Sequence, residues 1–206
     1  MTRVKICGIT CAEDAEAAVA AGAHALGFVF VPGTPRFIPP TAAAAVITAL
    51  PPFVSAVGVF VNQPLAEVVA TAGRCGLHLI QLHGEESEAF ARQLPLPVIR
   101  ALRVRDAQSL AVLDDYPARA FLLDAFVPGV AGGTGRTFPW EIAAARASVA
   151  PIILSGGLTP ETVGGAIKHV RPYAVDVSSG VESHPGRKDL QKLKEFMDHV
   201  RRADLD

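Results

Sequence analysis

The sequence predicts an α/β protein, a (β/α)8 barrel in which residues 1–206 form a single domain. Short apolar segments alternate eight times with alanine-rich segments of helical period. The apolar segments are hydrophobic throughout instead of alternating with polar residues, which is typical of parallel strands covered on both faces. No linker or low-complexity stretch divides the chain, and 206 residues suffice for eight strand–helix units.

The apolar segments are the expected strands, and the segments between them are the expected helices. Parallel strands need crossover connections, and a helix in each connection gives a right-handed crossover. The strands are expected at 4–7, 25–30, 54–61, 77–82, 97–104, 120–126, 151–157 and 173–179. The helices are expected at 11–23, 41–50, 62–76, 86–94, 106–116, 139–149, 159–170 and 188–202.

Two of the helices begin with recognisable signals. Thr10 is the expected N-cap of the first helix, with Glu13 in the position of a capping box. In TPE at 159–161 a proline lies just inside a threonine, which is another common helix start. The competing fold is an open doubly wound sheet, which usually carries a glycine fingerprint after its first strand. Here the first turn reads CGIT and the glycine-rich turns follow later strands, so the barrel is favoured.

Composition favours a soluble protein that binds neither nucleic acid nor membrane. The formal net charge is −1, from 19 basic and 20 acidic residues, and no basic stripe indicates nucleic acid binding. No segment reaches the roughly 18 consecutive apolar residues of a membrane span, and MTRVKI lacks the apolar stretch of a signal peptide. Three cysteines are few for a disulfide scaffold, so a reducing cytoplasm is expected.

Reactive groups at the carboxyl ends of the strands are the first candidates for a site, because active sites of such barrels lie there. In chain order the strand ends are Cys7, Phe30, Phe60, His83, Arg103, Asp124, Ser155 and Asp176. Cys7 could be a buried apolar residue, half of a disulfide, a metal ligand, or a nucleophile or base. His83 is expected to be a satisfied polar residue or a ligand contact. Because the histidines show no HxxxH or HxH spacing and the cysteines no CxxC, no metal is expected.

Two turns predict a phosphate site. SGGL at 155–158 and SSGVE at 178–182 follow the seventh and eighth strands, where barrels commonly bind phosphate. Backbone N–H groups at such turns can approach an anion closely, and a following helix adds a positive dipole. The expected contacts are Gly156, Gly157, Ser179 and Gly180. The alternative is that these glycines only form turns, but two adjacent turns of this composition favour phosphate.

Asp124 and Arg36 complete the candidate site. Asp124 follows three large apolar residues, so burial would raise its pKa and make it a usable acid, unless it is a structural aspartate. The segment 127–138 is long and rich in glycine, and is expected to cover the site. Arg36 lies among prolines on a stiff loop, which suits bidentate capture of a carboxylate, unless it is a surface arginine.

A set of motifs runs in order along nearly the whole chain. The motifs are VKICGIT, GFVF…PR, GVFVN, QLHGEE, LLDA…GGTGRTF, LSGGLTPE and VDVSSGVE…PGRKD. Together they resemble the phosphoribosylanthranilate isomerases of tryptophan biosynthesis. The resemblance implies a (β/α)8 barrel that uses no cofactor and no metal. It also implies an Amadori rearrangement of the aminoaldose N-(5-phosphoribosyl)anthranilate to the aminoketose 1-(2-carboxyphenylamino)-1-deoxyribulose 5-phosphate.

The resemblance implies a role for each candidate residue. Cys7 would be the general base, with a depressed pKa, and Asp124 the general acid, with a raised one. Arg36 would hold the anthranilate carboxylate, and the two glycine-rich turns would hold the phosphate. Asp176 would contact the ribose, and His83 would line the substrate pocket. The expected partner is this phosphosugar, with neither nucleic acid nor membrane, and the chain is expected to be a monomer or a homodimer.

The sequence departs from the family's pattern at three loop positions, namely Gly33, the segment after Asp124, and Arg136. These positions bear on the rate of turnover more than on the class of reaction.

Two other functions compete with the isomerase. Histidine-pathway isomerases act on a substrate with two phosphates, and the pattern of that family has a pair of aspartates at the site. In this sequence the first strand ends in Cys7 instead. The turn LHGEE after the fourth strand is also acidic. A non-catalytic phosphosugar-binding barrel would lack Cys7 or Asp124, and both are present.

Overall fold

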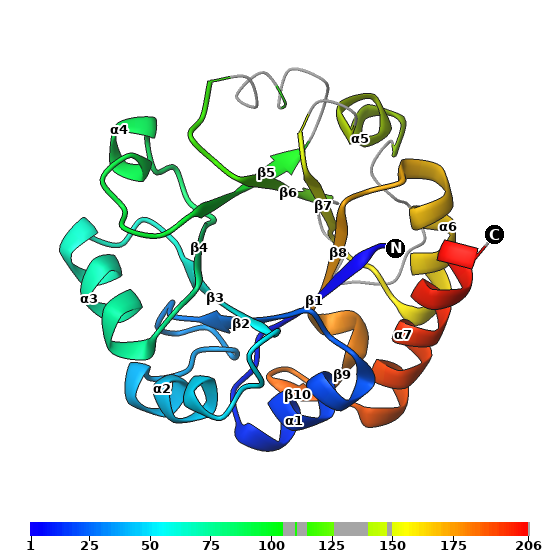
Figure 1. The fold of residues 1–206 in the computed structure, drawn as a ribbon, viewed down its shortest axis with the longest axis horizontal. Helices are drawn as coiled ribbons and strands as arrows, with labels where there is room; N and C mark the ends of the chain where they lie inside the picture. The colour runs from blue at the N-terminus through cyan, green and yellow to red at the C-terminus, as the bar shows by residue number, and fades with distance from the viewer. Residues whose placement is uncertain (105–109, 111–114, 126–139, 148–149, 206) are drawn as a thin grey trace.

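The computed structural model describes residues 1–104, 110, 115–125, 140–147 and 150–205. Eight parallel strands pair in chain order, and β8 pairs with β1 to close the barrel seen end-on in Figure 1. The strands are β1 (Arg3–Cys7), β2 (Ala25–Val29), β3 (Ser55–Phe60), β4 (Leu79–Leu82), β5 (Val98–Val104), β6 (Ala120–Ala125), β7 (Ile152–Ser155) and β8 (Ala174–Val177). The closed barrel confirms the predicted fold class and excludes the open sheet.

The helices form a ring outside the strands (Figure 1). They are α1 (Ala12–Ala21), α2 (Pro40–Thr48), α3 (Leu65–Cys75), α4 (Glu88–Ala91), α5 (Trp140–Ala147), α6 (Pro160–Val170) and α7 (Leu190–Leu205). The helix predicted at 106–116 lies mostly outside the described residues, as does the covering segment predicted at 127–138. Among the described residues, no helix combines the length and the hydrophobicity that crossing a membrane requires.

The start of α1 differs from the prediction. Cys11, with an extended φ of −150°, is the N-cap and makes no side-chain capping bond. Thr10 instead donates from Oγ1 to the carbonyl of Gly186 at 2.6 Å. Gly186 lies in a hairpin formed by β9 (Glu182–His184) and β10 (Arg187–Lys188). The Thr10 hydroxyl therefore makes a tertiary hydrogen bond instead of the local capping bond that the sequence predicted.

The start of α6 agrees with the prediction. Thr159 is the N-cap in a capping box with Thr162, and Pro160 occupies the first turn. Because Thr159 lies just after the turn that follows β7, this cap fixes the direction in which the chain leaves the barrel mouth. The two glycine-rich turns are thus held by a regular helix start on one side.

The barrel interior has an apolar layer and a polar layer. An interior cluster contains Val57, Ile99, Ala101, Ala120, Leu122, Ile153 and Ala174, with Leu79 packed against it. Side chains two residues apart on a strand point to the same face. Two residues beyond members of this layer, toward the carboxyl ends, come Gln81, Asp124, Ser155 and Asp176. The strands therefore place polar groups directly above an apolar floor.

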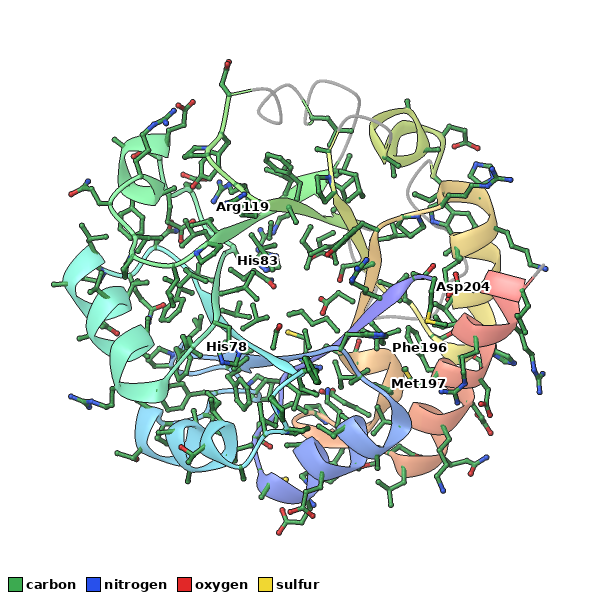
Figure 2. All side chains as sticks on the ribbon, in the orientation of Figure 1. His78, His83, Arg119, Phe196, Met197 and Asp204 are labelled. Atoms are coloured by element: carbon green, nitrogen blue, oxygen red, sulfur yellow. The ribbon has the colours of Figure 1, made fainter. Side chains whose placement is uncertain are left out.

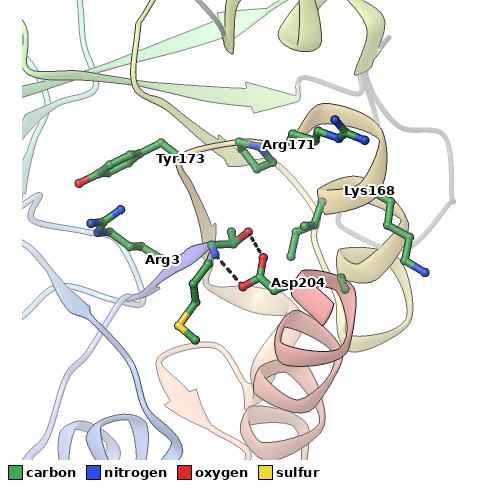
Figure 3. Close-up of a pocket in the computed structure, with 10 residues that line it drawn as sticks. Arg3, Lys168, Arg171, Tyr173 and Asp204 are labelled. Carbon is green, nitrogen blue, oxygen red and sulfur yellow. Dashed lines mark hydrogen bonds between the residues drawn. The ribbon is translucent and has the colours of Figure 1, made fainter. Parts of the chain in front are cut away.

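The opposite end of the barrel joins the two ends of the chain. The backbone N–H and the hydroxyl of Thr2 both donate to the carboxylate of Asp204 in α7, at 2.7 Å each (Figure 3). Arg3 lies over the ring of Tyr173 at 4.5 Å from its centroid. These contacts hold the N-terminal edge of β1 and leave its carboxyl end at the polar face.

Candidate active site

A cavity of about 460 Å³ opens at the carboxyl ends of the strands. All the predicted site residues line it, namely Cys7, Arg36, His83, Asp124, Gly156, Gly157, Asp176, Ser179 and Gly180. Arg103 and Ser155, which the sequence placed at strand ends, line it too. Phe30 and Phe60 do not, and their rings stack in the core at 5.3 Å between centroids. The barrel geometry thus brings together residues up to 173 positions apart in sequence.

Cys7 lies at the end of β1 beside a lysine that the sequence analysis did not single out. Lys5 precedes Cys7 by two residues, so both side chains point into the barrel. The buried Nζ of Lys5 donates to Oδ1 of Asp176 at 2.7 Å, and the hydroxyl of Ser155 donates to Oδ2 at 3.2 Å. Both carboxylate oxygens of Asp176 therefore already accept hydrogen bonds within the protein. The ribose contact predicted for Asp176 would use the same two oxygens.

Gly27 makes room for this pair. A Cβ atom at Gly27 would lie 2.7 Å from Sγ of Cys7 and 3.0 Å from Nζ of Lys5. Real Cβ atoms do not approach neighbours so closely, so any larger residue would displace one of the two groups. The thiol and the ammonium occupy adjoining space above the same backbone position.

The depressed pKa predicted for Cys7 is wrong for this structure. Burial raises the pKa of the Cys7 thiol above its ordinary value, because the charged form loses its hydration. The ammonium groups of Lys5 and Lys188 oppose this rise without cancelling it, and the Asp176 carboxylate adds to it. The sequence indicated polar groups near Cys7, but it does not show how deeply Cys7 is buried. In the structure Cys7 is only 8% exposed.

Arg36 forms a bidentate ion pair across the mouth. Its Nε donates to Oε1 of Glu182 at 2.8 Å and its Nη2 to Oε2 at 2.6 Å. Although burial raises the pKa of Glu182, hydrogen bonds from Arg36 and the charge of Lys188 hold it below the usual value. Glu182 was not singled out as a site residue in the sequence. The guanidinium is thus fixed in place by the protein before any ligand is bound.

Lys188 connects this pair to the backbone of Cys7. Its Nζ, with a fully buried side chain, donates to the carbonyls of Cys7 at 2.6 Å and Ser178 at 3.3 Å, and to Oε1 of Glu182 at 3.0 Å. The backbone N–H of Lys188 donates to buried Asp14 at 2.9 Å. The hairpin of β9 and β10 supplies both Glu182 and Lys188, and the sequence pattern gave no sign of that hairpin.

His83 and Asp124 face each other on the other side of the cavity. Nε2 of His83 lies 3.6 Å from Oδ2 of Asp124, and Figure 2 shows His83 on the inner side of the barrel. Nε2 of Gln81 lies 3.3 Å from Nδ1 of His83. With the amide nitrogen as donor, Nδ1 is the acceptor and the ring proton sits on Nε2, toward Asp124. The Asp124 side chain is 34% exposed, so its burial is only partial.

The two glycine-rich turns meet at the mouth beside α6. Gly156 and Gly157 have φ values of +87° and +70°, a conformation that favours glycine. A Cβ atom at Gly180 would lie 1.9 Å from the carbonyl oxygen of Leu158, so the second turn needs its glycine to approach the first. Ser179 begins a short 3-10 helix, η2 (Ser179–Val181). The turns expected to bind phosphate are therefore adjacent and line the same cavity.

Comparisons with known proteins agree with this arrangement. Residues 4–199 match the family model of N-(5'-phosphoribosyl)anthranilate isomerase. The N-(5'-phosphoribosyl)anthranilate isomerase of Geobacter metallireducens is 55% identical over 203 residues, covering 98% of this chain and 99% of that protein. The crystal structure of phosphoribosyl anthranilate isomerase from Thermotoga maritima has a TM-score of 0.91 and 43% identity, covering 98% of this chain and 99% of that chain.

A further solved structure contains a ligand. It is a phosphoribosyl anthranilate isomerase in complex with reduced 1-(o-carboxyphenylamino)-1-deoxyribulose 5-phosphate. Its TM-score to this chain is 0.87 at 41% identity, covering 98% of this chain and 99% of that chain. The family model and the relatives span nearly the whole sequence. This chain therefore belongs to the N-(5'-phosphoribosyl)anthranilate isomerase family.

Proposed function

We propose that this chain converts N-(5'-phosphoribosyl)anthranilate to 1-(2-carboxyphenylamino)-1-deoxyribulose 5-phosphate, as a cytoplasmic enzyme of tryptophan biosynthesis. The observation that carries the proposal is the cavity in which a thiol, a carboxyl group, a fixed guanidinium and two glycine-rich turns converge. An aldose–ketose isomerisation needs an acid, a base and anion-binding groups, and each class of group is present. The chemistry needs no cofactor or metal, and the protein acts as a monomer or a homodimer.

Asp124 is the proposed general acid. The furanose ring opens when its ring oxygen accepts a proton, which leaves a protonated Schiff base at the anomeric carbon. A carboxyl group that lines the cavity and is partly exposed can deliver that proton and regain one from solvent. His83 contacts Asp124 and so lies where the acid transfers its proton.

Cys7 is the proposed general base. The protonated Schiff base makes the C2′ hydrogen acidic, and the Cys7 thiolate removes it to give an enolamine. The enolamine then tautomerises to the ketone: the C2′ hydroxyl gives up its proton and C1′ accepts one, so that the net change is an isomerisation with no atom gained or lost. Only the thiolate can accept the proton, and the surrounding cations Lys5 and Lys188 favour that form.

Different groups in the cavity bind the substrate's two anionic ends. Among the described residues, Glu182 takes two of the five N–H donors of Arg36, so the guanidinium keeps donors for the anthranilate carboxylate. The phosphate is proposed to lie on the backbone N–H groups of Gly156, Gly157, Ser179 and Gly180. These anchors would place the ribose between the acid and the base, near Asp176.

The test is a turnover assay with freshly prepared N-(5'-phosphoribosyl)anthranilate and the purified chain. Cys7→Ala and Asp124→Asn should each lower kcat by about 10²- to 10⁴-fold, the usual worth of an acid or base, while the reduced product analogue still binds. Cys11→Ala is the matched control, since Cys11 is also a free thiol but does not line the cavity.

Two outcomes would overturn the proposal. Absence of turnover by the unaltered chain would remove the isomerase function and favour a phosphosugar-binding barrel. Full activity of either site variant would remove the acid–base assignment. Turnover of the two-phosphate aminoaldose in a parallel assay would show that the substrate assignment is too narrow.

A further inference from the structure

Five charged side chains surround Cys7. Lys5 on β1 and Asp176 on β8 form one buried ion pair, at 2.7 Å. Lys188 and Arg36 both pair with Glu182, at 3.0 Å and 2.6 Å. This cluster contains three cations and two carboxylates, so it carries one positive charge in excess. A thiolate at Cys7 would make the cluster neutral, whereas a thiol would leave it with one positive charge in excess.

Lys5 is the cation of the three that faces the sulfur. Its Nζ and the Cys7 Sγ both approach the space above Gly27, within 3.0 and 2.7 Å of the same point. Nζ of Lys188 instead donates to the backbone carbonyl of Cys7, at 2.6 Å. Arg36 turns its Nε and Nη2 toward Glu182. The ammonium has three N–H donors, and Asp176 accepts one, so donors remain for the sulfur.

We propose that Lys5 is a positioning residue for the base, whose ammonium group, anchored by Asp176, stabilises the thiolate form of Cys7 against the cost of its burial. The proposal rests on the proposed function in taking Cys7 as the base, and it adds a residue to which no catalytic role was given. Burial raises the pKa of Cys7, the charge of Lys5 lowers it, and the charge of Asp176 raises it again. Lys5 and Asp176 should therefore act on the thiol with opposite signs.

These opposite signs separate the proposal from a purely structural role. If the ion pair only supported the barrel, breaking it from either side would disturb Cys7 in the same way. If Lys5 is the partner of the thiolate, Lys5→Met leaves the carboxylate of Asp176 beside the sulfur and disfavours the thiolate. Asp176→Asn leaves the ammonium unopposed and favours it. Lys5→Met/Asp176→Asn removes both charges and serves as the matched neutral variant.

The experiment is the pH dependence of alkylation of Cys7 by iodoacetamide, followed by mass spectrometry of the cysteine-containing peptides. It uses the full chain without substrate, so it does not depend on isomerase turnover, and failure of the proposed function would show separately in the turnover assay. Lys5→Met should raise the midpoint by about one to three pH units, the range for a neighbouring charge. Asp176→Asn should lower it, and the neutral variant should lie between them.

Cys11 in the same molecules is the internal control, because it lies outside the cavity and should keep its midpoint. The pH limb of kcat/KM should move with the alkylation midpoint. Shifts of the same sign in both single variants, no shift in either, or an equal shift at Cys11 would overturn the proposal. If Lys5→Met does not fold, the comparison of Asp176→Asn with the neutral variant decides. A lower midpoint in Asp176→Asn supports the proposal, and an equal or higher one overturns it.

Discussion

The two sides of the cavity are built differently. On the β1 and β8 side, Cys7 is buried within a network of ion pairs, and Nζ of Lys188 alone makes three hydrogen bonds. On the β4 and β6 side, Asp124 is a third exposed and its contact with His83 is 3.6 Å long. The Cys7 side is therefore buried and crossed by ion pairs, whereas the Asp124 side is more exposed and has a longer polar contact.

This difference matches what an acid and a base need at one site. A carboxyl group that gives up a proton in each turnover must regain one, and exposure to water provides it. A thiolate must survive where it has little water, so fixed cations have to replace its hydration. Fixed cations on both sides would favour the ionised forms of both Cys7 and Asp124, which would leave no protonated group to act as the acid. The asymmetry of the cavity therefore fits the two different roles proposed for Asp124 and Cys7.

The largest expected effect tests whether the base side depends on its buried charges. Lys188→Met should lower the free energy of unfolding by about 3 kcal/mol or more, because it breaks a buried ion pair and leaves buried carbonyls unpaired. Lys192→Met is the matched control, since Nζ of Lys192 donates to the carbonyl of Glu182 at 2.8 Å from an exposed position. Denaturant unfolding should show a change below about 1 kcal/mol for that variant. Equal losses in the two variants would contradict the picture of a dry base side.

The pH dependence of catalysis gives the next effect. Since burial raises the pKa of Cys7, the thiolate fraction should grow with pH through neutrality and into the alkaline range. We expect kcat/KM to rise about tenfold per pH unit below that pKa, because activity follows the deprotonated base. Steady-state kinetics in overlapping buffers would measure this limb. An activity that is flat across this range would show that the base is already ionised well below neutral pH.

The sequence predicted the fold and the residues at the strand ends, but it did not predict the buried charges around Cys7. The barrel was predictable because eight continuous apolar runs with helices between them leave few other folds, and the strand ends then gave Cys7 and Asp124. Lys5 was missed because a strand that is buried on both faces shows no polar–apolar alternation from which its inward-facing residues could be identified. Glu182 and Lys188 were missed because they act through a short hairpin whose pairing depends on tertiary contacts with Thr10 and the β1 end.

The smallest expected effect concerns Gln81, which lies beside His83 on the side of the cavity proposed to supply the acid. Its amide nitrogen lies 3.3 Å from Nδ1 of His83, while among the described residues its Oε1 has no hydrogen-bond partner. Gln81→Met keeps the side-chain volume but removes the donor, so the imidazole is no longer held with its proton toward Asp124. We expect kcat to fall roughly fivefold, the worth of one neutral hydrogen bond of about 1 kcal/mol, with KM little changed.

Stability should not fall with it, because Gln81→Met also removes a buried oxygen that the described protein leaves unpaired. The decisive readout is the limb on which kcat/KM rises with pH, together with the alkylation midpoint of Cys7. Both should stay where they are in the unaltered protein, because within the described part of the chain the Gln81 side chain approaches His83 and makes no hydrogen bond to any of the five charged side chains around the thiol. A shift as large as that of the Lys5 variant would mean that the two sides of the cavity are coupled, and that the base does not depend on its own side alone.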